Sequence, residues 1–181
     1  MSSPLSTDVL LARNKAYLPT HQPIPTRADI ISVIGYMPPQ IMVVTCADPR
    51  CIPETFLKLQ TSEAITIRNA GGNIETALPD ILALDVLLGL QEIVVIKHTD
   101  CGSLAYTDEG VKRVLGERAP GMQEEIAKME FGSIAGKTLE QGLREQVDVV
   151  KGSGLVREDL KARIRGFVFD LASGGLMEVD V

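Results

Sequence analysis

Two short apolar runs, each ending in sulfur-containing and polar residues, constrain the fold of this chain more than any other feature. The first run reads Ile-Met-Val-Val-Thr-Cys at 41–46, and the second reads Ile-Val-Val-Ile-Lys-His at 93–98. Both are continuous in Val and Ile rather than alternating, which is typical of buried parallel strands. The carboxyl ends of such strands meet in one crevice, where α/β proteins bind their ligands. We therefore expect the polar residues at the ends of these two runs to lie together.

Three residues at these strand ends predict a zinc site. Cys46 closes the first run, and His98 and Cys101 form a His-x-x-Cys step at the end of the second. Two thiolates and an imidazole are a soft donor set that suits zinc, and three protein ligands leave one coordination position open, as catalytic zinc sites do. The alternative is two buried thiols and a core histidine, each of which is common. The placement of all three residues at matched strand ends favours zinc.

Asp48 and Arg50, which follow Cys46, predict a functional ion pair. Pro49 biases Asp48 toward an extended conformation, in which side chains two positions apart point the same way. Arg50 would then hold the carboxylate ionised and fixed in direction. Beside zinc, Asp48 can accept a hydrogen bond from bound hydroxide, or it can turn onto the metal and block the open position. The alternative is a turn ion pair without a catalytic role.

Other residues that attract attention are not expected to bind a metal or cofactor. The segment 68–72 reads Arg-Asn-Ala-Gly-Gly, which predicts a tight turn with positive φ and a close approach of backbone to the site. It is not a Gly-x-Gly-x-x-Gly fingerprint, and nothing nearby supports dinucleotide binding. Cys51 is interpreted as a small core residue. His21 lies in a proline-rich connector and is given no metal role.

The rest of the chain alternates between strand and helix patterns, which predicts an α/β fold with a central, mostly parallel sheet and an antiparallel edge strand, flanked by helices. Residues 1–25 are expected to be an N-terminal helix and connector, and residues 26–181 a single α/β zinc-binding catalytic domain. The predicted elements are a helix at 6–18 capped by Ser6 or Thr7, strands at 41–46, 64–68 and 92–97, a short helix from Pro53 to about Gln60, a buried helix at 77–90, helices within 103–151 and a hairpin at 166–171 and 176–179.

Composition excludes several classes of partner. The 181 residues carry a formal net charge of −6 and no basic cluster, which argues against nucleic acid. No apolar run approaches the ~18 residues of a membrane span, so no membrane partner is expected. The N-terminus has neither the basic leader nor the long apolar core of a secretory signal. Three Cys are a poor disulfide framework, so a reducing, cytoplasmic setting is expected.

Three segments in order resemble the signature of the β-class carbonic anhydrases. They are Cys-Ala-Asp-Pro-Arg at 46–50, Arg-Asn-Ala-Gly-Gly at 68–72 and His-Thr-Asp-Cys-Gly at 98–102, and the resemblance extends to the final hairpin. The short length resembles the minimal members of that family. The resemblance implies a β-carbonic anhydrase-like fold, zinc held by Cys46, His98 and Cys101, and a catalytic dyad of Asp48 and Arg50. It also implies an obligate homodimer or higher homo-oligomer, with the N-terminal helix as an arm that reaches across the partner.

The activity implied by this resemblance is zinc-dependent, reversible hydration of carbon dioxide to bicarbonate and a proton by metal-bound hydroxide, which makes the protein a carbonate dehydratase, a zinc lyase. One departure from the family is Pro49, where Ser is usual, because proline removes a backbone donor and a hydroxyl. Substrate preference is therefore left open.

Three other functions remain possible from the sequence. Enzymes that hydrolyse carbonyl sulfide or carbon disulfide to hydrogen sulfide and carbon dioxide resemble this family closely and use the same zinc chemistry. A non-catalytic protein with a structural zinc is a second alternative, favoured if Asp48 blocks the open position. A metal-free enzyme with Cys46 as nucleophile beside Arg50 is the third. Metal analysis and a comparison of hydrogen sulfide release with carbon dioxide hydration separate these alternatives.

Overall fold

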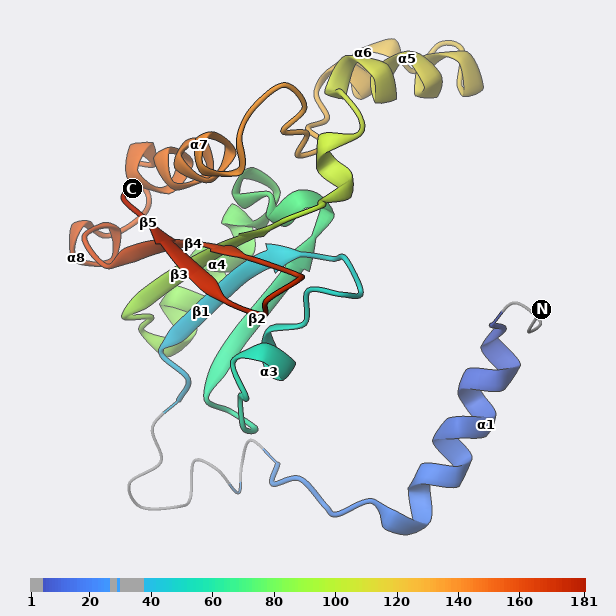
Figure 1. Ribbon diagram of the computed structural model, residues 1–181, viewed down its shortest axis with the longest axis vertical. Coiled ribbons are helices and arrows are strands. Elements are labelled where there is room, and N and C mark those ends of the chain that lie inside the picture. The colour runs from blue at the N-terminus through green and yellow to red at the C-terminus, as the bar shows by residue number, and fades with distance from the viewer. Residues whose placement is uncertain (1–4, 27–28, 30–37) are drawn as a thin grey trace. The chain divides into compact units, whose positions relative to one another are not determined.

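The computed structural model describes residues 5–26, 29 and 38–181, and its centre is a mixed β-sheet (Figure 1). In this part of the chain five strands follow the order β2-β1-β3-β4-β5, and every neighbouring pair is parallel except β4 and β5, which are antiparallel. The strands are β1 (Ile41–Cys46), β2 (Ala64–Asn69), β3 (Glu92–His98), β4 (Ile164–Phe169) and β5 (Leu176–Val179). The α/β fold class, the mostly parallel sheet and its antiparallel edge are confirmed.

Helices and short turns precede the first strand and connect the strands that follow. In the described ranges they are α1 (Thr7–Tyr17), η1 (Leu18–Thr20), α3 (Pro53–Phe56), η2 (Ala70–Gly72), α4 (Ile74–Leu88), η3 (Gly102–Leu104), α5 (Asp108–Arg118), α6 (Gln123–Ala127), α7 (Leu139–Gly152) and α8 (Glu158–Lys161). Residues 103–151 therefore hold several helices, as expected, and α5 ends before the Pro120-Gly121 break.

Register places the ends of the central strands side by side. Cys46 at the end of β1 is paired with Asn69 at the end of β2. His98 at the end of β3 is paired with Phe169 at the end of β4. Because β1 and β3 are parallel neighbours, Cys46 and His98 reach the same edge of the sheet. The expected convergence of strand ends is confirmed.

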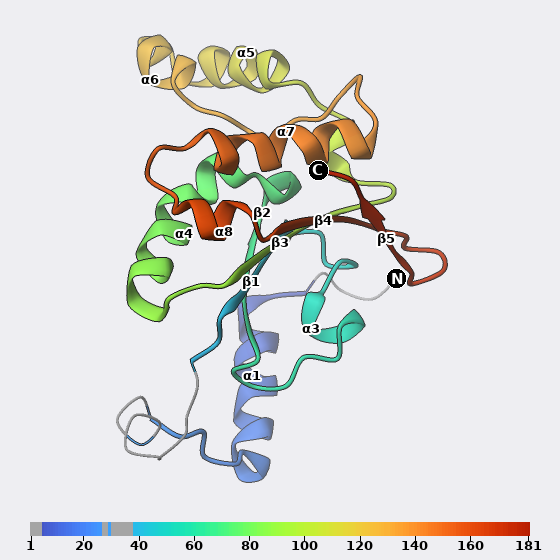
Figure 2. The same ribbon diagram turned by 90° about the vertical axis from the view of Figure 1, so that its left-hand side faces the viewer.

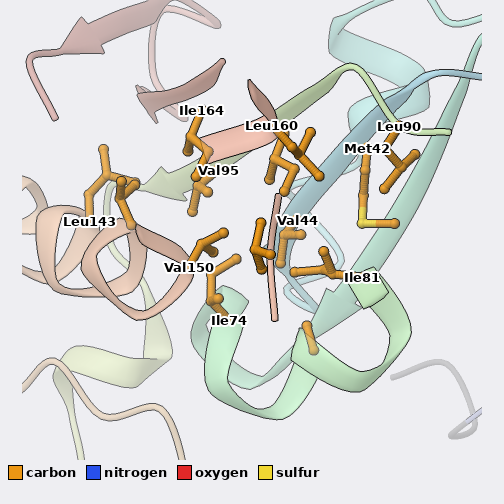
Figure 3. Packing of buried hydrophobic residues seen from close by; sticks show 14 of the residues in the cluster. Met42, Val44, Ile74, Ile81, Leu90, Val95, Leu143, Val150, Leu160 and Ile164 are labelled. Atoms are coloured by element: carbon orange, nitrogen blue, oxygen red, sulfur yellow. The ribbon is translucent and has the colours of Figure 1, made fainter. Parts of the chain in front are cut away.

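The larger core lies between one face of the sheet and helices α4 and α7 (Figures 2 and 3). Met42 and Val44 of β1 and Val95 of β3 meet Ile81 of α4 and Val150 of α7 there. The other face carries a smaller cluster next to α3, in which the rings of Phe56 and Phe169 stack with their centroids 4.1 Å apart. Helices thus cover both faces, but the second face is covered only in part.

The bounds of helices α3 and α4 differ from the sequence expectation. Helix α3 begins at Pro53 as predicted but ends at Phe56, because Lys58 takes a positive φ of 55° that no right-handed helix accepts. Helix α4 begins at Ile74, three residues before the predicted start, and Asn73 caps it by accepting the Glu75 N–H at 2.9 Å. Gly89, in the left-handed region, ends it.

The chain divides into two compact units, residues 1–37 and 38–181. In the first unit, α1 forms where predicted, and the Ser6 hydroxyl accepts the Val9 N–H as the expected N-cap. None of the residues of α1 is buried. Most of the stretch 26–37, which the sequence places in the catalytic domain, lies outside the described residues. No helix in the described ranges has the length and hydropathy needed to cross a membrane.

Candidate metal centre

Cys46, His98 and Cys101 lie together at the carboxyl edge of the sheet. Cys46 is the last residue of β1 and His98 the last of β3, while Cys101 lies in the turn that leads into η3. Their Sγ, imidazole nitrogen and Sγ atoms all lie within 4.8 Å of one another, and all three residues are buried. The structure therefore brings together the three residues that the sequence selects as ligands.

The His98 ring presents an unpartnered nitrogen to the two sulfurs. Its Nδ1 lies 2.8 Å from the carbonyl oxygen of Thr99. A carbonyl only accepts hydrogen bonds, so Nδ1 carries the proton and Nε2 keeps a free lone pair. Within the described part of the chain, Nε2 is buried and has no hydrogen-bond partner. Such an atom is costly to bury unless a ligand occupies it, and an oriented neutral imidazole is how histidine binds metals.

Hydrogen bonds surround the two sulfurs. Cys101 Sγ lies 3.7 Å from Cys46 Sγ and 3.1 Å from the Ser103 hydroxyl, and Cys46 Sγ accepts the Asp48 N–H at 3.4 Å. The contact with the Cys46 sulfur, and to a smaller extent the Ser103 hydroxyl, lowers the pKa of the Cys101 thiol. Cys101 is therefore the more acidic thiol of the pair, and the thiolate is the form of cysteine that binds a cation.

Asp48 lies beside the three residues and is held by Arg50. The Arg50 Nε donates to Asp48 Oδ1 at 3.0 Å, and Nη2 donates to Oδ2 at 2.7 Å. These hydrogen bonds keep the pKa of the Asp48 carboxyl well below its usual range. Oδ2 lies 3.9 Å from His98 Nε2, so the carboxylate faces the sulfur–nitrogen cluster without being part of it. The predicted ion pair is present, but the backbone is not extended as expected. Pro49 and Arg50 lie in a turn, in which the Cys51 N–H donates to the Asp48 carbonyl at 2.9 Å and the Arg50 N–H donates to Asp48 Oδ1 at 2.9 Å.

Asp100 is a second partner of Arg50 that the sequence analysis did not identify. Its carboxylate accepts from Arg50 Nη1 at 2.7 Å, and its backbone carbonyl accepts from Nη2 at 3.0 Å. Asp100 has a positive φ of 54°, which turns the chain between His98 and Cys101. The signal was present in the sequence, because Asp tolerates this conformation better than most residues.

The end of β2 and the η2 turn that follows it contact the segment that carries Cys46 and Asp48. Arg68 donates to the backbone carbonyls of Cys46 and Asp48 at 3.2 and 2.7 Å. Gly71 and Gly72 have φ values of 67° and 63°, so the predicted tight turn is confirmed. A Cβ on Gly72 would lie 3.0 Å from the carbonyl carbon of Thr45, which leaves no room for a side chain. The turn is therefore a close backbone approach to the end of β1.

Lys97, like Asp100, is a residue near the cluster that the sequence did not single out. From the sequence, Lys97 is included in an apolar strand without being given a role. In the structure its side chain is only 2% exposed, and its ammonium donates to the carbonyls of Gly71 and Gly72 at 2.6 and 3.2 Å. Burial lowers its pKa to about 8, which leaves it a cation at neutral pH. Nothing in a single sequence separates a buried lysine at this position from an exposed one.

The two residues set aside from the sequence have other environments. Cys51 is fully buried on the smaller core face, and its sulfur lies 3.3 Å from the Thr45 hydroxyl. The Tyr17 hydroxyl lies 2.8 Å from His21 Nδ1 in the N-terminal unit. Cys51 is the core residue that the sequence predicts.

Comparison with known proteins identifies relatives. The sequence model of a family described as carbonic anhydrase matches residues 41–176. Beta-carbonic anhydrase 1 of Mycobacterium tuberculosis is 33% identical over 146 residues, which cover 79% of this chain and 85% of that protein. Carbon disulfide hydrolase of an Acidianus species is 37% identical over 75 residues, which cover 41% of this chain and 37% of that protein.

Solved structures show the same fold. The carbonic anhydrase of Streptococcus mutans superposes with a TM-score of 0.77 at 26% identity, covering 99% of this chain and 100% of the other. The carbonic anhydrase of Glaciozyma antarctica gives a TM-score of 0.76 at 26% identity, with the same coverage of both chains.

Proposed function

The chain belongs to the β-carbonic anhydrase family, and from this premise we propose that it is a carbonate dehydratase that interconverts carbon dioxide and water with bicarbonate and a proton. We assign zinc to Cys46, His98 and Cys101. The observation that carries the proposal is the buried His98 Nε2, which has no hydrogen-bond partner among the described residues. The ligand atoms of Cys46, His98 and Cys101 all lie within 4.8 Å of one another, beside the ionised Asp48. Zinc, when bound, supplies a Lewis acid that makes water nucleophilic near neutral pH.

Asp48 is the residue that we assign to orient the attacking water. Its carboxylate is ionised and therefore only accepts hydrogen bonds. Oδ1 already accepts both the Arg50 N–H at 2.9 Å and Nε at 3.0 Å, whereas Oδ2 accepts Nη2 alone. Oδ2 therefore keeps a lone pair, and it is the oxygen that faces His98. Arg50 acts through Asp48 by holding this orientation.

The geometry supports a catalytic role for the metal better than a structural role. Asp48 would have to leave Arg50 to fill a fourth position, and it makes two hydrogen bonds with the Arg50 side chain instead. Structural zinc sites are closed by four protein ligands, and three are assembled in the described residues.

Hydrolysis of carbon disulfide or carbonyl sulfide is the second candidate function. It is favoured by the carbon disulfide hydrolase of the Acidianus species, which is 37% identical over 75 residues. The same cluster and the same Asp48 would serve, since these molecules, like carbon dioxide, carry an electrophilic carbon between two heteroatoms. Hydrogen sulfide release and carbon dioxide hydration, measured on one preparation, decide between the two substrates.

The test of the main proposal joins metal content to turnover. The purified protein should hold about one zinc per chain and accelerate carbon dioxide hydration in a stopped-flow assay. Cys46→Ser should lose zinc and activity together. Cys51→Ala is the matched control, since it removes the third, non-clustered thiol and should keep both. Activity in a metal-free sample, or zinc without hydration, would refute the proposal.

We also propose that the protein is a cytoplasmic homodimer or higher homo-oligomer. Its three cysteines are free thiols, which fits a reducing compartment. Helix α1 exposes Val9, Leu10 and Leu11, and the sheet carries an apolar groove of about 530 Å³ lined in part by Val94 and Phe167. Apolar surfaces of this kind mark association sites. We assign α1 as the arm that one protomer lays on its partner.

A further inference from the structure

Lys97 is a buried cation that the proposed chemistry does not use. It lies on β3 two residues after Val95, so both side chains point to the same face of the strand. A buried ammonium is costly unless its donors are taken by acceptors. Its acceptors are the carbonyls of Gly71 and Gly72, at 2.6 and 3.2 Å. The side chain therefore ties β3 to η2.

The turn that Lys97 holds lies against both sulfur-bearing segments. A Cβ on Gly72 would lie 3.1 Å from Thr45 Cα and 3.2 Å from Cys46 N, so Gly72 packs on the backbone that carries the first sulfur. A Cβ on Gly71 would lie 3.1 Å from Ser103 Cβ and 3.3 Å from its hydroxyl. The same hydroxyl lies 3.1 Å from Cys101 Sγ.

We propose that Lys97 is a positioning residue of the metal centre, which fixes the 71–72 turn so that Cys46 and the Ser103–Cys101 pair keep their spacing. The inference rests on the proposal that Cys46, His98 and Cys101 hold zinc. It assigns the lysine no contact with metal or substrate. Its action runs through the glycine carbonyls and from them to the two sulfurs.

A purely structural lysine would stabilise the fold without affecting how the sulfurs bind a metal. The two roles separate in a spectrum, because the thiolate-to-cobalt charge-transfer and d–d bands of a Co²⁺-loaded protein depend on the position and hydrogen bonding of the sulfurs. Loss of stability alone does not shift these bands. The probe is Co²⁺ added to the purified full-length apoprotein, with Zn²⁺ affinity measured by competition with a chelator.

Lys97→Met keeps the length of the stem and removes the donors. We expect shifted Co²⁺ bands and a Zn²⁺ dissociation constant raised about tenfold or more, the usual effect of removing an outer-shell partner. Val95→Ala is the matched control, because it removes buried volume from the same face of β3 without touching the turn. It should lower the melting temperature while leaving both the bands and the Zn²⁺ affinity unchanged.

Lys97→Gln decides the question if the methionine variant does not fold, since it keeps an amide donor on a shorter side chain. A smaller shift in the same direction supports the proposal. Lys97 variants that fold with wild-type bands and wild-type Zn²⁺ affinity overturn it, even if they are less stable. A wild-type protein that binds neither metal overturns the proposed function first, so the two failures are distinguishable.

Discussion

At the residue scale, the position of Asp48 is set by its immediate neighbours in sequence and by one residue of the adjacent strand. Its N–H donates to Cys46 Sγ, and its carbonyl accepts from Arg68 at 2.7 Å. The carboxylate is held by Arg50. Pro49 contributes no backbone donor and fixes its own φ. The carboxylate is therefore preorganised, and a preorganised acceptor costs no reorganisation during the reaction.

Asp48→Asn tests this role with almost no change of shape. The amide oxygen can still accept from Arg50, but the side chain is no longer an ionised acceptor. We expect kcat/KM for carbon dioxide hydration to fall about 100-fold or more, because a positioned acid–base group contributes about that much. Zinc content should stay near the wild-type level. Stopped-flow rates and metal analysis on the same preparation measure both quantities.

Asp159→Asn provides the matched control for Asp48→Asn. Asp159 also pairs with an arginine two residues away, Arg157, but it lies far from the cluster in sequence and its side chain is exposed. Its loss should leave the rate of hydration unchanged. A wild-type rate in the Asp48 variant would contradict the assignment of the dyad.

The sequence predicted the cluster residues because residue type and strand position were both visible in it. Cys46 and His98 are unusual side chains at the ends of apolar runs, and Asp48 and Arg50 follow one of them. The role of Lys97 was not predictable, because it depends on where the 71–72 carbonyls fold back. The contacts of Lys97 with Gly71 and Gly72 join residues that are 26 and 25 positions apart, and such contacts leave no pattern in the local sequence.

At the scale of elements, the strands were predicted better than the helices. The run at 41–46 matches β1, and β2 and β3 each extend one residue beyond the predicted end. Strand β4 begins and ends two residues before the predicted 166–171, and β5 matches the predicted 176–179. Continuous apolar sequence marks a buried strand along its whole length. Helix ends depend instead on single residues, such as the left-handed Lys58 after α3 and the Asn73 cap of α4. Those signals were present but weaker than the apolar pattern.

An ion pair links α4 to α8, and its loss should destabilise the fold in a pH-dependent way. Asp85 is about 10% exposed and accepts Arg157 Nη2 at 2.8 Å and Nε at 3.0 Å. We expect Asp85→Asn to lower the free energy of unfolding by about 1 kcal/mol at pH 7, as for one net hydrogen bond. Urea unfolding at fixed protein concentration measures it.

The pH dependence of this effect has a definite sign. The Arg157 hydrogen bonds lower the pKa of the folded Asp85 carboxyl. The stabilisation is therefore complete above the unfolded carboxyl pKa of about 3.9 and is lost as pH falls through the lower folded value. The wild type and Asp85→Asn should differ at pH 5 to 7 and converge in stronger acid.

Glu117→Gln is the control for the Asp85 variant. Glu117 pairs with Arg113 on the exposed surface of α5, and such pairs contribute less than about 1 kcal/mol. It should change the free energy of unfolding much less than Asp85→Asn. An Asp85→Asn effect no larger than that of Glu117→Gln would show that the link between α4 and α8 carries little stability.

At the scale of the whole molecule, exposed apolar surface indicates association. The sequence predicts a buried helix at 77–90, but α4 is buried only in part, through residues such as Ile81, which enters the core. On the same helix Val86 is 90% exposed and Leu87 is 59% exposed. Leu10 and Leu11 of α1 are about half exposed. A single chain leaves these groups in water, and we propose that a second copy of the chain covers them.

The assignment of α1 as a dimer arm is tested by Leu10→Asp with Leu11→Asp. Both side chains are exposed in the single chain, so the charges should not disturb the 38–181 unit itself. If a partner buries them, two carboxylates would enter an apolar contact, and that is unfavourable. We expect sedimentation equilibrium to show the wild type as a dimer or larger and the variant shifted toward monomer. Asn14→Asp with Lys15→Asn makes the same change of charge on the same helix and should stay associated. If the variant with Leu10→Asp and Leu11→Asp stays oligomeric, α1 is not part of the interface. The exposed end of α4 is then the next surface to test.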